Sequence, residues 1–156
     1  MKDKLVEVSE YTGEGYLPVI TYQGWRVAIL NYIDELEAEN IERLQYHDET
    51  DEVFVLLKGS FILYVAGNDP EKPGEIEAIN LEPYKMYNVK RGTWHTHTLS
   101  RDAMCLIIEN SDTEDDVNSP RVFVTERQKK QLVELFENIV DDKALYYGRK
   151  KLERVV

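Results

Sequence analysis

The sequence contains a single cysteine among its 156 residues, so the chain can form no internal disulfide. Cys105 lies in the apolar run AMCLIIE, where cysteine usually acts as a small buried hydrophobic side chain rather than as a nucleophile. No stretch approaches the ~20 apolar residues of a spanning helix, and the opening MKDKLVEVSE lacks the apolar segment of a secretory signal. We therefore expect a cytoplasmic protein.

Basic residues are also few. The 19 lysines and arginines stand against 30 aspartates and glutamates, which gives a formal net charge of −11. Nucleic acids and anionic membrane surfaces are bound by basic faces, so we expect neither as a partner. The negative field would attract cations, including metal ions, although the same charge also serves solubility alone.

Long helical patterns are missing from most of the chain, and short apolar runs separated by turns take their place. Because no helices separate these runs, parallel βαβ units are excluded and an all-β sandwich or barrel is predicted. We expect one domain over 1–156, with a barrel core at about 16–124 and a C-terminal helix and tail at 125–156. The strand-like runs are residues 16–22, 25–33, 41–47, 52–58, 61–66, 76–82, 85–91, 94–100, 103–109 and 121–124.

Glycine occurs only eight times, and Gly59 stands between two of the most apolar runs, EVFVLLK and FILYVA. Glycine adopts positive φ at little cost, so this spacing predicts a β-hairpin that turns at Gly59.

The pattern changes at Thr125, which is followed three residues later by Gln128, the spacing of a helix-capping box. The residues that follow carry one apolar stripe at helical spacing. This helix should pack on the barrel, or alternatively form a dimer contact. The stripe consists of Leu132, Leu135, Phe136, Ile139 and Val140.

Two short segments resemble the two motifs of the cupin superfamily. The spacing His47-x4-Glu52-x6-Gly59 resembles the first motif, and KRGTWH at 90–95 resembles the second. The resemblance covers about residues 25–110 and implies a double-stranded β-helix, or jelly-roll barrel. The chain departs from the motifs at five positions, namely Glu39, Gln45, Tyr84, Lys90 and Leu99.

The resemblance also implies a divalent metal at the mouth of the barrel, held by His47, Glu52 and His95, with Gln45 or His97 completing the set. Strand alternation independently puts Gln45 and His47 on one face, and His95 and His97 on one face of another strand. Imidazole and carboxylate ligands suit Zn, Mn, Fe, Ni or Co, and no organic cofactor is indicated.

Other roles for the same residues are open at this point. His47 could be a hydrogen-bonded histidine at a strand edge, and His97 a polar barrel residue. Glu52 could instead pair with Arg43 or Lys58.

Two candidate functions follow. The first is a metal-dependent small-molecule enzyme of the isomerase, lyase or dioxygenase type. The second is a non-catalytic, metal-free cupin that binds a small ligand such as a sugar or a carboxylate. In either, Arg43 shares the face of His47 and could hold a carboxylate, while Trp94 could stack on a ligand.

The C-terminal tail predicts a homodimer. It is basic in an acidic protein, and it adds apolar side chains beyond the one helix stripe that the barrel needs. Alternatively the tail folds back on its own barrel or is disordered. The apolar side chains are Leu145, Tyr146, Tyr147, Leu152, Val155 and Val156, and the basic ones are Arg149, Lys150, Lys151 and Arg154.

Overall fold

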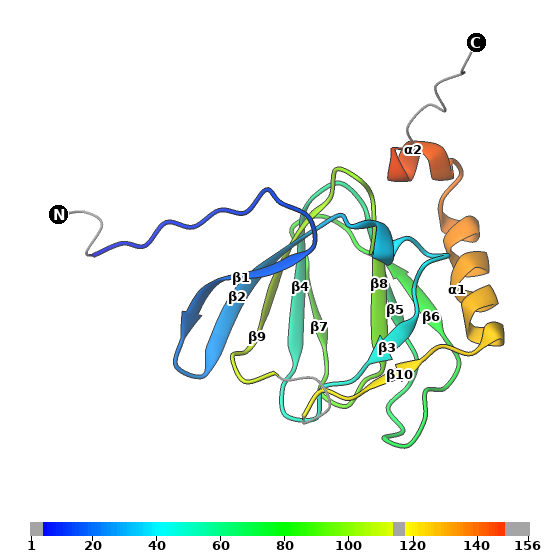
Figure 1. The fold of residues 1–156 in the computed structure, drawn as a ribbon, viewed down its shortest axis with the longest axis horizontal. Coiled ribbons are helices and arrows are strands. Elements are labelled where there is room, and N and C mark those ends of the chain that lie inside the picture. The colour runs from blue at the N-terminus through cyan, green and yellow to red at the C-terminus, as the bar shows by residue number, and fades with distance from the viewer. Residues whose placement is uncertain (1–4, 114–117, 149–156) are drawn as a thin grey trace, which may run out of the picture.

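The computed structural model describes residues 5–113 and 118–148, and these form two five-stranded antiparallel sheets that face each other (Figure 1). The strand order is β1-β2-β9-β4-β7 in the first sheet and β10-β3-β8-β5-β6 in the second. This confirms the all-β sandwich or barrel predicted from the short apolar runs, and the jelly-roll barrel that the resemblance to cupins implies. The strands are β1 (Tyr16–Tyr22), β2 (Trp25–Asn31), β3 (Arg43–Gln45), β4 (Glu52–Lys58), β5 (Phe61–Val65), β6 (Glu77–Asn80), β7 (Met86–Val89), β8 (His95–Leu99), β9 (Met104–Asn110) and β10 (Arg121–Phe123).

The strands β5 and β8 of the second sheet are buried on both faces, as β5 illustrates. Phe61 and Leu63 point into the core between the sheets, whereas Ile62 and Tyr64 belong to a second core beneath the C-terminal helix. Strand β8 is likewise buried at all of its positions. A strand with both faces covered places every side chain in a dry environment, so its histidines need partners.

The predicted hairpin at Gly59 is wrong. Strands β4 and β5 do not pair: β4 pairs with β7 and β9, and β5 pairs with β6 and β8. The turn instead carries the chain from one sheet to the other, and Gly59 does adopt positive φ, at 75°. A strand–glycine–strand pattern is the same for a hairpin and for a crossing between sheets, because both need a tight reversal.

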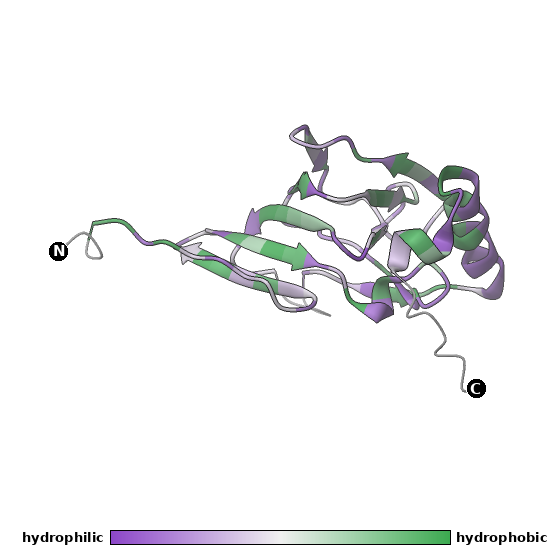
Figure 2. Cartoon of the chain, turned by 90° about the horizontal axis from the view of Figure 1, so that it is seen from above, coloured by the Kyte–Doolittle hydropathy of each residue, from purple (hydrophilic) through white to green (hydrophobic). Residues whose placement is uncertain are grey.

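Helix α1 (Glu126–Ile139) begins with the predicted capping box. The Thr125 hydroxyl accepts a hydrogen bond from the backbone nitrogen of Gln128, whose side chain accepts one from the backbone nitrogen of Thr125. Leu132 and Phe136 are buried against the second sheet. Figure 2 shows the outer side of this helix as hydrophilic. The stripe thus covers the barrel, as expected.

A short helix, α2 (Lys143–Tyr147), brings the start of the tail back onto the same barrel. Tyr147 is 1% exposed and stacks on Phe136 with the ring centroids 5.1 Å apart. Its hydroxyl bonds to the Thr98 hydroxyl at 2.7 Å and accepts from the Ala38 nitrogen at 3.0 Å. This aromatic therefore anchors to its own chain rather than to a neighbour.

The remaining tail residues named above, 149–156, lie outside the described residues, and the homodimer stays a prediction. A 3₁₀ turn, η2 (Asp34–Leu36), completes the elements. Within residues 5–113 and 118–148, none of the helices has the length and apolar character needed to cross a membrane.

Candidate metal centre at the mouth of the barrel

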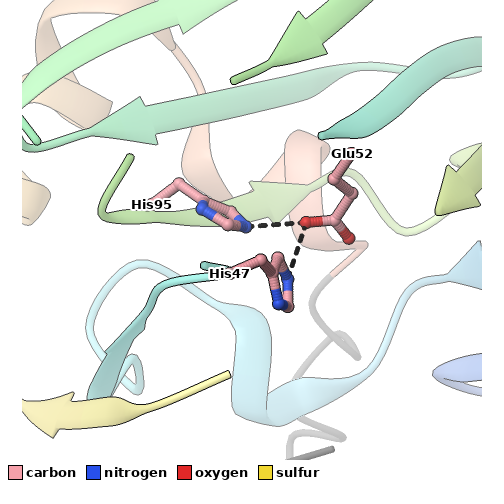
Figure 3. Close-up of side chains that lie close together, drawn as sticks. All are labelled: His47, Glu52 and His95. Carbon is pink, nitrogen blue, oxygen red and sulfur yellow. Dashed lines mark hydrogen bonds and ion pairs between the residues drawn. The ribbon is translucent and has the colours of Figure 1, made fainter. Parts of the chain in front are cut away.

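Three buried side chains converge between the two sheets, and they are His47, Glu52 and His95 (Figure 3). Glu52 Oε2 lies 2.8 Å from His95 Nε2 and 3.0 Å from His47 Nε2. The three candidate ligand atoms all lie within 4.8 Å of one another. Such spacing suits atoms that share one ion.

Elements from both sheets build this cluster. Glu52 is the first residue of β4 in the first sheet, and His95 is the first residue of β8 in the second. Gln45, the last residue of β3, lies opposite His95 in the register, and His47 follows two residues later. The site therefore forms only when the sheets face each other.

Hydrogen bonds on the far side of each imidazole decide where its proton sits. His95 Nδ1 lies 2.8 Å from the Thr93 carbonyl oxygen, which can only accept, so Nδ1 carries the hydrogen. His47 Nδ1 lies 2.6 Å from Ser119 Oγ, which itself donates to Asn118. In their neutral forms both rings then turn the Nε2 lone pair toward Glu52.

Two lone pairs facing one carboxylate oxygen repel unless a cation lies between them. That cation is either a proton on an imidazole or a metal ion. His47 Nε2 also makes no hydrogen bond of good geometry in the described part of the chain, despite its 3.0 Å approach to Glu52. Metal-binding histidines commonly hold their second nitrogen through a carbonyl or another oxygen in this way.

Electrostatics agrees with a charged cluster. Burial would raise the pKa of Glu52, but its contacts with His47 and His95 and their charge outweigh this effect and hold that pKa well below its usual range. Burial would lower the pKa of His47, but the 3.0 Å contact with the charged Glu52 outweighs this effect and raises the pKa above its ordinary value. Glu52 is thus kept ionised by the imidazoles, not by the Arg43 or Lys58 partners considered from the sequence.

Gln45 and Arg43 line a cavity beside the cluster, and this cavity has a volume of about 1170 Å³. Arg43 also lies over the Phe123 ring, 4.8 Å from its centroid. Both residues come from β3, so the predicted alternation of this segment does bring them to the same opening as His47.

His97 lies outside the three-residue cluster. Its ring stacks on Phe61 at 5.2 Å between centroids and contacts Phe54 at 5.7 Å, and its buried Nδ1 has no hydrogen-bond partner among the described residues. Burial lowers its pKa to about 4. Its surroundings are those of a neutral core histidine.

Trp94 is on the opposite face of its segment from His95 and belongs to the core beneath α1. Its Nε1 donates to the Asp69 carbonyl at 2.7 Å, and its ring packs on Tyr46 at 4.8 Å. The structure does not bring Trp94 to the cavity, because alternation along the chain turns it away from the face that carries His95. Cys105 is fully buried, as predicted, and burial raises its pKa to about 12.

Sequence reasoning missed Glu109, which is 6% exposed and lines the same cavity. Its Oε1 accepts hydrogen bonds from the Tyr16 hydroxyl at 2.5 Å and from Arg26 Nη2 at 2.8 Å. A signal was present: Cys105, Ile107 and Glu109 share one face of β9, so a carboxylate closes an otherwise apolar inward stripe.

No protein-family model matches the sequence, and no curated protein matches it. Among solved structures, a hydroquinone 1,2-dioxygenase from Sphingomonas with 4-hydroxybenzoate bound aligns with a TM-score of 0.52 at 9% identity, over 66% of this chain and 69% of that chain.

Two smaller proteins align over more of their own length. A cupin-2 domain protein from Shewanella frigidimarina gives a TM-score of 0.43 at 20% identity, over 70% of this chain and 88% of that one. A nucleoside dehydratase described as a β-barrel gives a TM-score of 0.48 at 12% identity, over 77% of this chain and 90% of that chain. With its two facing sheets and its strand order, the chain has the fold of the cupin superfamily.

Proposed function

We propose that this protein is a metal-dependent enzyme that acts on a small molecule in the cavity at the barrel mouth. His47, Glu52 and His95 would hold a divalent transition metal (Zn, Mn, Fe, Ni or Co), and Gln45 could complete the set. The observation that carries this proposal is the approach of two imidazole Nε2 atoms to one buried carboxylate oxygen, while Ser119 and the Thr93 carbonyl hold the other ring nitrogens.

The bound metal would act as a Lewis acid on a carbonyl or hydroxyl oxygen of the substrate. Residues of the chain would orient the metal-binding imidazoles and the substrate. Ser119 and the Thr93 carbonyl fix the orientation of the two imidazoles. Arg43, at the wall of the cavity, offers a guanidinium that could hold a substrate carboxylate.

A second candidate is a metal-free barrel that binds a sugar or a carboxylate. It is favoured by the raised pKa of His47, because a proton shared between this imidazole and Glu52 would also relieve the repulsion between them. The two candidates differ in what occupies the space between His47 and Glu52.

Metal analysis of the purified protein separates them. We expect stoichiometric Zn, Mn, Fe, Co or Ni, or stabilisation by about 2.7 kcal/mol when one of these ions is added to the chelated protein at a hundredfold excess over Kd. His47→Ala should abolish that stabilisation, whereas Asp48→Asn, an exposed neighbour, should keep it. A wild-type protein that carries none of these metals and is stabilised by none of them contradicts the proposal and favours the second candidate.

A further inference from the structure

We propose that Glu109, on strand β9, is an additional protein ligand of the metal centre and that it binds the metal through Oε2. This inference rests on the proposed metal site at His47, Glu52 and His95. It gives the centre a second carboxylate, supplied by a residue outside both motif-like segments.

The two oxygens of Glu109 have different surroundings. Oε1 is occupied by the Tyr16 hydroxyl and by Arg26, whose Nη2 and Nε lie 2.8 and 3.2 Å away. Oε2 is buried and has no hydrogen-bond partner among the described residues. It lies 3.9 Å from His47 Nε2, the other unpartnered atom of the site.

An unpartnered buried carboxylate oxygen is costly, because it has lost its water and gained nothing in return. The same is true of the unpartnered imidazole nitrogen of His47 that it faces. One cation between the two atoms would satisfy both, and neither a proton nor a direct hydrogen bond can do so across 3.9 Å.

The separations within the cluster and the one from Glu109 to His47 are compatible with a shared ion, and Glu109, which lies outside the three residues whose ligand atoms are all within 4.8 Å of one another, would shift toward it. Two ligand atoms that each lie about 2.1 Å from one ion are about 3.0 Å apart at a right angle and about 4.2 Å apart on opposite sides. Glu52 Oε2 lies 2.8 and 3.0 Å from the two imidazole nitrogens, near the first value. The 3.9 Å between Glu109 Oε2 and His47 Nε2 falls between the two values.

Arg26 and Tyr16 then become positioning residues. Arg26 lies opposite Glu109 in the β2–β9 register, so the pair is held by the sheet itself. Their hydrogen bonds to Oε1 fix the rotation of the carboxylate and leave Oε2 directed at the site, as hydrogen-bonded ligand carboxylates are in metal centres. The charge of Arg26 also offsets the second carboxylate beside Glu52.

Co²⁺ and Mn²⁺ titrations of the chelated protein test this inference. Glu109→Gln keeps the shape and the bonds to Tyr16 and Arg26 but weakens the ligand. We expect it to raise the Kd of both ions at least tenfold and to change the visible absorption spectrum of bound Co²⁺. Glu42→Gln, which removes an exposed carboxylate lining the same cavity, should behave as wild type in both measurements.

The outcomes are distinct. If wild type binds the ions and Glu109→Gln leaves Kd and the Co²⁺ spectrum unchanged, this inference is overturned while the proposed function stands. If wild type binds neither ion, both fail. Should Glu109→Gln not fold, Tyr16→Phe decides: a roughly tenfold weaker Kd, the usual scale for a partner that orients a ligand, supports the inference, and an unchanged Kd overturns it.

Discussion

Replacing His97 by leucine should make the protein more resistant to acid. In the folded chain this ring lies between Phe54 and Phe61 and its pKa is lowered to about 4, because burial disfavours the charged form. In the unfolded chain the imidazole takes up a proton near its ordinary pKa of about 6.5. Wild type therefore loses stability as the pH falls from about 6.5 to 4, because only the unfolded state binds the proton in that window.

The size of this loss follows from the two pKa values. Each unit of difference corresponds to about 1.4 kcal/mol, so the loss is about 2 kcal/mol at pH 5 and about 3 kcal/mol at pH 4. His97→Leu has no titratable group at this position and should not show this loss of stability. Leucine also fits an apolar site where Nδ1 has no hydrogen-bond partner among the described residues.

Urea unfolding of chelated wild type and His97→Leu at pH 7.5 and pH 5 measures the difference directly. The pH 7.5 comparison is the control, because it contains the packing change without the titration. We expect the variant to gain about 2 kcal/mol relative to wild type between the two conditions. A difference in unfolding free energy that stays constant with pH would refute the reasoning and mean that His97 is not held neutral by its surroundings.

Four further predictions concern the fold. Gly59→Ala should lower the free energy of unfolding by more than about 2 kcal/mol and lower the Tm strongly, because a Cβ there would lie 2.6 Å from Ala103 Cα at a φ of 75°. The control Gly24→Ala, where a Cβ would have nothing within 4 Å, should be tolerated. Thr125→Ala removes the N-cap of α1 and should cost about 1 kcal/mol in urea unfolding; no loss would mean that the box is not used in solution. Tyr147→Phe leaves the buried Ala38 nitrogen and Thr98 hydroxyl without their partner, so we expect a loss of about 1–3 kcal/mol in thermal unfolding, and an unchanged Tm would place α2 elsewhere. Sedimentation should give a dimer mass; a monomer at micromolar concentration excludes it, and a dimer that survives deletion of residues 144–156 excludes a role for the tail.

Strand alternation and local chemistry determined much of the architecture. Short apolar runs between turns, such as EVFVLLK, specify strands, and Thr125 with Gln128 specifies a helix start, because both signals act between neighbours in the sequence. The resemblance to the two cupin motifs indicated the three residues that converge.

What alternation cannot specify is which sheet a strand joins or how deep a residue lies within it. The turn at Gly59 was compatible with a hairpin, and only the pairing of β4 with β9 and of β5 with β8 placed the two strands in different sheets. His95 and His97 share one face, but two residues along a strand are about 6.6 Å apart. That distance puts one imidazole beside Glu52 and the other among phenylalanines.

The position of Glu109 also depends on the pairing of strands that are distant in the sequence. It is separated from Glu52 by more than fifty residues, and no local pattern relates the two. The pairing of β9 with both β2 and β4 brings Glu109 beside Arg26 and next to the cluster of His47, Glu52 and His95. The sequence therefore determined the strands and the helix start, because these depend on local spacing, and its resemblance to the cupin motifs indicated the three side chains that converge. Only the tertiary structure decided the neutral setting of His97 and the free oxygen of Glu109, because burial and partner choice depend on how distant strands pair.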